Sequence, residues 1–378
     1  MKKTLNATSA LVAVGLLTLG ASEAFAQAAA PAAPEKMKIG LGGFMLQTMG
    51  YADQSNSLGA TSATQYKHFD TKSDTEVYFT GSVKLDNGIT LGVNVQLESD
   101  VQTAAGTVID ESYMSIAHDT FGTLVLGSTD GAGSNLNVQA PWAGAANPYT
   151  GDMPSWVVDP GTVIADGMST GENAGGSNDD NLIKWTSPSL AGFRVGVSYA
   201  SSQTDSADQP VVTAVDQYET GLQYSGKIGE VGLRVSGIYW STQGATDATQ
   251  YDGWALGTDF VFGEFTVGGG YGEMNQNGDV ALTAATRSAA TETWNIGGKW
   301  TSGPTTVALT YGNQKAGATG NDPDDDTHTR WLLGANYILG PGVTLVGSAM
   351  RMTFEDEAGT ATLENKGWAV VGGVQVDF

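Results

Sequence analysis

Short stretches of alternating apolar and polar residues follow one another along the chain from Met37 to the C-terminus. In the segment 89–98 one face is entirely aliphatic, and the other carries Thr, Gly, Asn, Gln and Glu. The segment 193–200 repeats this pattern, with Phe, Val, Val and Tyr alternating with Arg, Gly, Ser and Ala. A period of two places successive side chains on opposite faces, so each stretch predicts a β-strand between two different environments.

The connections between these stretches alternate between short and long. Sixteen strands are predicted, at residues 37–52, 74–85, 89–98, 107–118, 122–128, 180–187, 193–201, 216–227, 231–241, 250–262, 265–273, 291–302, 305–314, 327–338, 343–354 and 364–378. Every second connection is a tight turn rich in Gly, Pro, Asn and Asp, as hairpins require. This order gathers turns at one rim and long polar loops at the other, which is typical of outer-membrane barrels. The pattern therefore predicts an all-β, sixteen-stranded antiparallel transmembrane β-barrel, wide enough for an aqueous lumen.

Aromatic residues stand repeatedly at the ends of the apolar faces. They are Tyr199, Tyr218, Tyr224, Tyr239, Trp254, Tyr271, Trp294, Trp300, Tyr311, Trp331, Tyr337 and Trp368. A lipid-facing wall places aromatic girdles at its two interfaces, whereas the core of a soluble sandwich has no reason to do so. One strand is ambiguous, because Met350, Met352 and Phe354 compete with Val343 and Leu345 for the lipid face; Arg351 is therefore left unassigned.

The N-terminus has the features of an export signal. Lys2 and Lys3 precede an apolar stretch, and Ala24-Phe25-Ala26 forms a small-x-small cleavage site. We expect residues 1–26 to be a signal peptide, 27–36 a short Ala/Pro linker and 37–378 the barrel. A membrane anchor is the alternative interpretation of this segment, and the apolar stretch is too short for one.

Composition and charge exclude several other classes of protein. The chain has no cysteine, which excludes disulfide scaffolds, thiol catalysis and cysteine-based zinc sites. Its formal net charge of −23 argues against a nucleic-acid partner, because phosphate binding requires a basic surface. The three histidines, His68, His118 and His328, are isolated in the sequence, so we expect no catalysis.

One acidic cluster is a weak candidate for a structural Ca²⁺ site. Asp322, Asp324 and Asp326 lie in a long outer loop, and hard cations take oxygen ligands. A solvated acidic loop tip is the alternative, and it is favoured. No other cofactor is expected.

Several motifs resemble those of the Gram-negative general porin family, in particular its alphaproteobacterial members. The run 181–193, Asn-Leu-Ile-Lys-Trp-Thr-Ser-Pro-Ser-Leu-Ala-Gly-Phe, is similar to a hairpin of that family. The run 121–127, Phe-Gly-Thr-Leu-Val-Leu-Gly, resembles one of its strands, and the segment 74–91 fits its second hairpin. The resemblance implies a trimeric barrel whose third loop folds inward and narrows the pore.

The longest connection, 129–179, stands where that family has its constriction loop. By composition the loop is predicted to lack regular structure, and loops of this length in a compact domain are usually functional. Its acidic residues predicted to line the constriction are Asp152, Asp159, Asp166 and Glu172. On the facing wall we expect Lys184, Arg194, Arg234 and Glu111, with Lys184 and Arg234 at mid-barrel height and Arg194 near the rim of short turns. Since carboxylates outnumber the facing cations, a mild cation preference is predicted.

The expected function is passive diffusion of ions and small hydrophilic solutes through a water-filled outer-membrane channel. A substrate-specific channel, in which lumen aromatics such as Trp240 guide a sugar, is the alternative. A blocked receptor barrel would need a plug, for which no segment of sufficient size remains. The expected partners are two further copies of the chain, outer-membrane lipid and lipopolysaccharide, and the barrel-assembly machinery, which would read the terminal Phe378.

Overall fold

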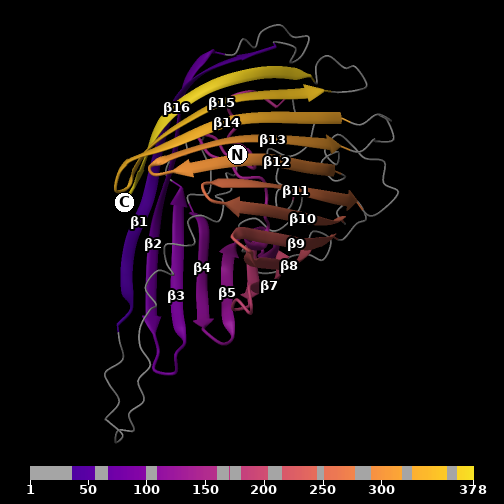
Figure 1. Ribbon diagram of the computed structural model, residues 1–378. Coiled ribbons are helices and arrows are strands. Elements are labelled where there is room, and N and C mark those ends of the chain that lie inside the picture. The colour runs from indigo at the N-terminus through magenta and orange to yellow at the C-terminus, as the bar shows by residue number, and fades with distance from the viewer. Residues whose placement is uncertain are drawn as a thin grey trace, which may run out of the picture.

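The computed structural model describes residues 36–55, 67–98, 109–159, 170, 180–202, 215–244, 251–276, 291–316, 326–355 and 364–378. Within these ranges sixteen strands form one closed antiparallel barrel, in which sequence neighbours pair and β1 pairs with β16 (Figure 1). The predicted barrel is confirmed. The strands are β1 (Lys38–Gln54), β2 (Phe69–Lys84), β3 (Thr90–Glu98), β4 (Ile109–His118), β5 (Gly122–Thr129), β6 (Asp180–Thr186), β7 (Phe193–Ser202), β8 (Val215–Ile228), β9 (Val231–Gly244), β10 (Tyr251–Phe262), β11 (Phe265–Gln276), β12 (Thr291–Ser302), β13 (Thr305–Ala316), β14 (Asp326–Gly340), β15 (Val343–Glu355) and β16 (Asn365–Asp377).

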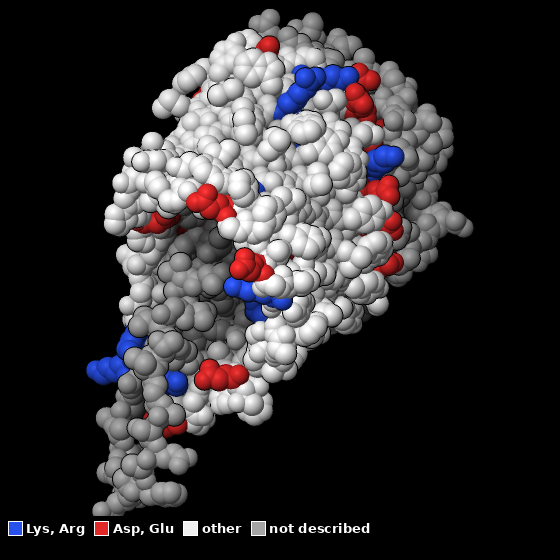
Figure 2. All heavy atoms as spheres, viewed as in Figure 1, with Lys and Arg blue, Asp and Glu red and all other residues white. Residues whose placement is uncertain are grey.

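The two faces of the wall differ as the period of two predicts. Along β14, His328, Arg330 and Leu332 are buried, whereas the alternate residues Trp331 and Leu333 are 48% and 50% exposed. The buried set faces the interior, and the exposed set belongs to the apolar outer surface. Figure 2 shows an outer wall that is mostly uncharged, with charged side chains gathered mainly along its margins. Because lipid offers no hydrogen bonds, a closed sheet with such an exterior is a stable way to cross it with strands.

Aromatic side chains pair across neighbouring strands on the outer face. Trp294, Tyr311 and Trp331 form a continuous row over β12, β13 and β14, with ring centroids 5.1 and 4.6 Å apart. Toward the rim of short turns, Phe193 and Tyr224 pair across β7 and β8 at 4.8 Å. The aromatic residues thus lie in two bands, as the girdles of a lipid-facing wall require.

Closure of the barrel brings the C-terminal residue back onto the first strand. The Gly43 N–H donates to the Phe378 carbonyl oxygen (3.0 Å), and the Phe378 N–H donates to the Gly43 carbonyl oxygen (3.1 Å). Gly43 has a φ of +154°, and a Cβ at this position would lie 2.1 Å from the carbonyl oxygen of Glu76 on β2. Glycine is therefore required here, because a side chain would push β1 away from β2.

The long connection between β5 and β6 contains regular structure that its composition did not predict. Residues Ala132–Leu136 form a short helix, α1, and residues 151–156 form turns. The prediction of a structureless loop was wrong in this part, because packing against the wall stabilises a helix too short to form alone. Within the described ranges, no helix has the length and apolar character needed to cross a membrane.

We predict that Gly43→Ala destabilises the barrel at its closure. The substitution combines a backbone conformation reserved for glycine, which costs about 1–3 kcal/mol, with a steric clash against β2. The midpoint of heat-induced unfolding in detergent, followed by circular dichroism of the sheet, should fall. Gly372→Ala on β16 is the control, because a Cβ there meets no atom within 4 Å. Equal unfolding midpoints for the two variants would contradict this account of the closure.

Candidate functional site

Residues 130–159, the longer of the two described parts of the connection between β5 and β6, lie inside the barrel. It begins with α1, which contacts β6, β7, β8 and β9. Leu136, Met153 and Val157 in this segment are fully buried, whereas a loop on the surface would expose such side chains. This segment, the inner loop, is therefore part of the interior of the molecule.

Side chains on the inner face of the wall accept hydrogen bonds from the backbone of the inner loop. A loop inside a barrel has no neighbouring strand, so its N–H groups need other acceptors. The N–H groups of Ala132, Gly133, Val138, Ala140, Gly144, Ala145 and Val158 donate to Ser198 Oγ (3.0 Å), Glu219 Oε2 (2.9 Å), Ser236 Oγ (2.8 Å), Asn295 Oδ1 (2.9 Å), Asn336 Oδ1 (2.9 Å), Ser348 Oγ (2.8 Å) and Gln54 Oε1 (2.9 Å). These acceptors follow the wall in order from β7 through β15 to β1, so the loop is fixed along its length.

Two basic side chains of the wall bind carbonyl oxygens of the inner loop. Lys184 on β6 is 6% exposed, and its Nζ donates to the Asp130 carbonyl oxygen (2.7 Å). Arg330 on β14 is 1% exposed, and its Nη1 donates to the carbonyl oxygens of Pro148 (3.2 Å) and Thr150 (3.4 Å). Both cations hold the loop in place and lie away from open solvent.

An apolar core lies between the inner loop and the wall at β14–β16 and β1. Met153 and Trp156 of the loop belong to the same buried cluster as Met350, Met352 and Phe354 of β15. The last two are fully buried, and Met350 is 4% exposed. The ambiguity of this strand is thereby resolved: these three residues face inward, and Arg351 is exposed on the outer face.

Two glycines of the wall allow the loop backbone to lie directly on the sheet. A Cβ at Gly257 of β10 would be 1.7 Å from the Val138 carbonyl oxygen, and one at Gly334 of β14 would be 1.7 Å from that of Ala143. No side chain fits into so short a distance, so the approach of the loop to the wall depends on these glycines.

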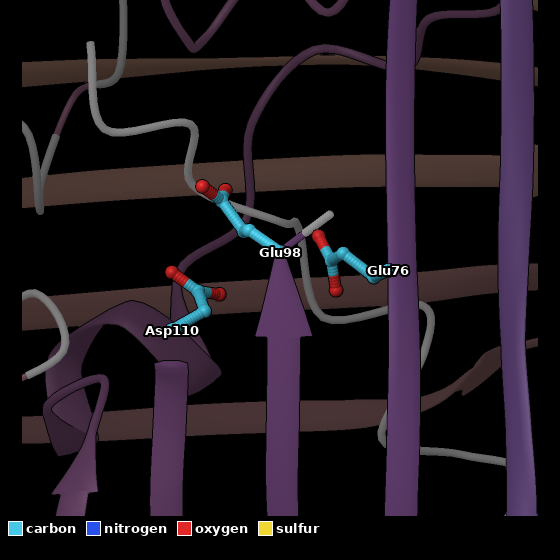
Figure 3. Close-up of side chains that lie close together, drawn as sticks. All are labelled: Glu76, Glu98 and Asp110. Carbon is cyan, nitrogen blue, oxygen red and sulfur yellow. The ribbon is translucent and has the colours of Figure 1, made fainter. Parts of the chain in front are cut away.

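Carboxylates gather on the arc of the wall formed by β2, β3 and β4. This acidic arc consists of Asp74, Glu76, Glu98, Asp110 and Glu111. Carboxylate oxygens of Glu76, Glu98 and Asp110 lie within 4.8 Å of one another (Figure 3). The hydrogen bonds of the inner loop described above fall on other strands, so this arc is a distinct part of the lumen.

The remaining predicted wall cations have different surroundings. Arg234 on β9 forms an ion pair with Asp259 on β10, which is 1% exposed, and its Nε donates to Asp259 Oδ2 at 2.9 Å. Arg194 is exposed and lies on the same face of β7 as the loop-binding Ser198. Arg194 and Arg234 are thus both exposed, Arg234 being engaged by a carboxylate, while Lys184 is buried and engaged by the loop.

Some of the predicted acidic residues lie in the described part of the structure, and the others lie outside it. Asp152 is half-buried, and its Oδ2 accepts a hydrogen bond from the Asn147 N–H at 3.1 Å; Asp159 is also half-buried. On the wall, Glu111 accepts hydrogen bonds from Gln96 and from Thr129 Oγ1. Asp166, Glu172, Asp322 and Asp324 lie outside the described residues. Asp326, the third member of the weak metal cluster, begins β14 and is 5% exposed; a site there stays a prediction.

Tyr149 fixes the conformation of the loop from within. Its hydroxyl donates to the Ala140 carbonyl oxygen at 2.5 Å, and its N–H donates to Asn147 Oδ1 at 2.9 Å. Complete burial raises the pKa of the Tyr149 hydroxyl above its usual value, because the ionised form would lose its solvation. The hydroxyl therefore remains a donor across the physiological pH range.

Some functional residues were not predicted. Asp74 and Asp110 belong to the acidic arc, and Ser198, Asn295 and Ser348 bind the loop. The period of two places Asp74 on the face of Glu76, a signal that was available. Asp110 lies within an irregularity in the pairing of β3 with β4, which no pattern in the sequence marks.

The chain is similar to porins both in its sequence and in its fold. The chain matches the family model described as Gram-negative porin over residues 7–357. Among solved structures, it is similar to the anion-selective porin from Comamonas acidovorans, with a TM-score of 0.62 and 16% identity over 91% of this chain and 100% of the other. It is also similar to a mutant of the Rh. blastica porin, with a TM-score of 0.58 and 18% identity over 90% of this chain and 100% of the other. A search of curated proteins finds no significant match.

We predict that Arg330→Met loosens the middle of the inner loop. The variant keeps most of the side-chain volume but leaves buried carbonyl oxygens without a donor, a loss of about 1–3 kcal/mol. Hydrogen exchange of the backbone amides around residues 144–152, measured by mass spectrometry on the detergent-solubilised protein, should accelerate about tenfold or more. Arg351→Met is the matched control, since Arg351 points outward from the neighbouring strand. Unchanged protection in Arg330→Met would rule out this role.

Proposed function

The chain belongs to the Gram-negative porin family, and on that basis we propose that it is a cation-preferring diffusion channel. Proteins of this family are non-enzymatic channels of the outer membrane. The finer proposal concerns which solutes pass: small hydrophilic molecules and ions, with cations favoured over anions. The observation that carries it is the acidic arc on β2–β4, together with the engagement of the wall cations elsewhere.

The charge distribution in the lumen supports a cation preference. Five carboxylates stand on neighbouring strands of the acidic arc, and carboxylates lining a pore favour cations. Lys184 and Arg330 bind loop carbonyl groups in buried positions, and Arg234 is paired with Asp259. These three positive charges are thus compensated or held by the loop, whereas Arg194 stays exposed.

We propose that the constriction lies between the inner loop and the acidic arc. On the loop side, Asp152 and Asp159 would line it, together with the predicted Asp166 and Glu172. On the wall side, Glu111 would face them. Arg194 would be an exposed cation of the lumen near the rim of short turns, and Arg234 would add little net charge. Lys184 would act on the pore mainly by holding the loop.

The anion selectivity stated for the Comamonas acidovorans porin belongs to that protein. At 16% identity the likeness extends to the fold, and selectivity follows from the side chains of the lumen. The proposal therefore assigns this chain the opposite preference on the basis of its own carboxylates.

A reversal-potential measurement tests the proposal. In a planar bilayer with a KCl gradient, the wild type should conduct K⁺ in preference to Cl⁻. Glu111→Gln removes one charge without changing the size of the side chain, and a carboxylate about 6 Å from a passing ion contributes roughly 0.7 kcal/mol in water. Because this charge attracts K⁺ and repels Cl⁻ by the same amount, the permeability ratio should fall by about tenfold.

Glu264→Gln is the control for this measurement. Glu264 lies in the tight turn between β10 and β11 and accepts hydrogen bonds from Trp300 and Ser302, which lower the pKa of its carboxyl below the usual value. It therefore carries a full charge at neutral pH but stands outside the lumen wall. Anion preference in the wild type, or equal effects of the two substitutions, would refute the proposed role of the lumen carboxylates.

A substrate-specific channel remains the second candidate, and Trp240 does not support it. Trp240 faces inward but is 3% exposed, and its ring packs against Gly253, where a Cβ would lie 2.2 Å from Cζ2. An aromatic guide for sugars needs an exposed ring face. Saturable block of the conductance by one class of solute would nevertheless favour this candidate over general diffusion.

We further infer that the protein is exported by cleavage after Ala26 and assembles as a trimer in the outer membrane. The barrel-assembly machinery would recognise Phe378, which is 60% exposed at the end of β16, and lipid and lipopolysaccharide would contact the outer wall. We propose that the outer face of β1 forms the contact between the subunits of the trimer. Its outward residues Ile39, Leu41, Met45 and Met49 are exposed and aliphatic or thioether in character, whereas the aromatic row lies on β12–β14.

We predict that Met45→Lys disrupts the trimer whereas Leu309→Lys does not. Both residues lie near the middle of their strands and are exposed to 45% and 49% on the outer face. A charge at either position is unfavourable in lipid, so the comparison isolates the subunit contact. Native mass spectrometry in detergent would report the oligomeric state. A trimer that tolerates Met45→Lys would place the subunit contact elsewhere.

A further inference from the structure

Three carboxylates from three neighbouring strands converge within the acidic arc. Glu76 of β2 stands directly opposite Glu98 of β3 in the strand register, and Asp110 of β4 completes the group. One oxygen atom of each residue lies within 4.8 Å of those of the other two, and Figure 3 shows Glu76 pointing toward Glu98, with Asp110 on the other side of Glu98. Like charges at this distance repel, and directly opposed like charges destabilise a strand pair. The arrangement therefore requires something that compensates it.

The burial of Glu76 makes this requirement stronger. The residue is 0% exposed, and neither of its carboxylate oxygens has a hydrogen-bond partner of normal geometry among the described residues. The charges that act on it most strongly belong to Asp110, Asp74 and Glu98, which are all acidic, and Tyr78 is the polar neighbour that acts on it from the same face of β2. A buried carboxylate is stabilised by a cation, by hydrogen bonds or by taking up a proton. A cation between the three carboxylates would provide this stabilisation.

We propose that Glu76, Glu98 and Asp110 bind a Ca²⁺ ion. Hard divalent cations take oxygen ligands, and two ligands on opposite sides of a Ca²⁺ ion are separated by about 4.6–5.2 Å, twice the Ca–O distance. The three oxygens, all within 4.8 Å of one another, are therefore close enough to share one ion. The chain has no cysteine, and the group contains carboxylates alone, so a thiophilic or imidazole-binding metal is disfavoured. Water would complete the coordination.

The site would join β2, β3 and β4 at the side of the β2–β3 hairpin that lies away from its tight turn. Glu98 is the last residue of β3 and Asp110 the second residue of β4, while Glu76 lies in the middle of β2. A bound ion would link the end of β3 and the start of β4 to the middle of β2. It would also reduce the negative charge of the acidic arc. The bound ion would offset part of the charge on which the proposed ion preference rests, but the test of Ca²⁺ binding is independent of that preference, since it is measured without any transport.

Calorimetric titration of the full-length protein tests the proposal. The protein, solubilised in detergent and treated with a chelator, is titrated with CaCl₂, and its unfolding midpoint is measured with and without Ca²⁺. The wild type should bind one ion per chain and unfold at a higher temperature when Ca²⁺ is present. Glu76→Gln should weaken binding at least tenfold and abolish the shift. Glu98→Gln, at a less buried position, gives the same test if Glu76→Gln fails to fold.

Glu355→Gln is the matched control. Glu355 is an exposed acid at the end of β15, paired with Lys366, and its loss should leave Ca²⁺ binding unchanged. Absence of binding by the wild type, or binding by both arc variants with wild-type affinity, would overturn the proposal. A wild type that prefers cations in bilayers but binds no Ca²⁺ would overturn the site alone. A wild type that binds Ca²⁺ but prefers anions would leave the site standing and refute the proposed selectivity.

Discussion

The hydrogen bonding of buried backbone groups is the constraint on which the rest of this structure depends. In the wall it is met by closure: each strand has two neighbours, and the last residue of the chain bonds to Gly43. Inside the wall a different solution is needed, because the inner loop has no strand beside it. Serine, asparagine, glutamine and glutamate side chains of the wall supply the acceptors. One requirement thus determines both the sheet and the side chains that project from its inner face.

The same requirement shapes the electrostatics of the lumen. The carbonyl oxygens of the loop also need donors, and Lys184 and Arg330 provide them. A cation held in this way serves the fold and is withdrawn from the solvent of the pore. The acidic arc on β2–β4 has a different environment, since the backbone hydrogen bonds of the inner loop described above go to other strands. The asymmetry between the two sides of the lumen therefore follows from where the loop lies.

The fold was predictable from the sequence because its main signals are local. Alternation along each strand, tight turns and aromatic strand ends are all properties of a few consecutive residues, and they specified sixteen strands in their correct order. The position of the inner loop depends on contacts between residues far apart in the chain, such as Ala132 with Ser198 or Gly144 with Asn336. No short pattern encodes these contacts. For the same reason the faces of Met350 and Met352 were ambiguous: an apolar side chain fits lipid on one side and the packed loop on the other.

The distributed anchoring of the inner loop also has a mechanical consequence. The loop is attached to strands on different sides of the barrel, from β6 through β15 to β1, and it rests without a gap on Gly257 and Gly334. A hollow cylinder of sheet is held open across its axis only by its wall unless something spans its interior. A segment fixed at many points of the inner circumference acts as a brace. Lateral pressure from the surrounding membrane is therefore borne by the brace as well as by the wall, and the cross-section of the cylinder is held against collapse.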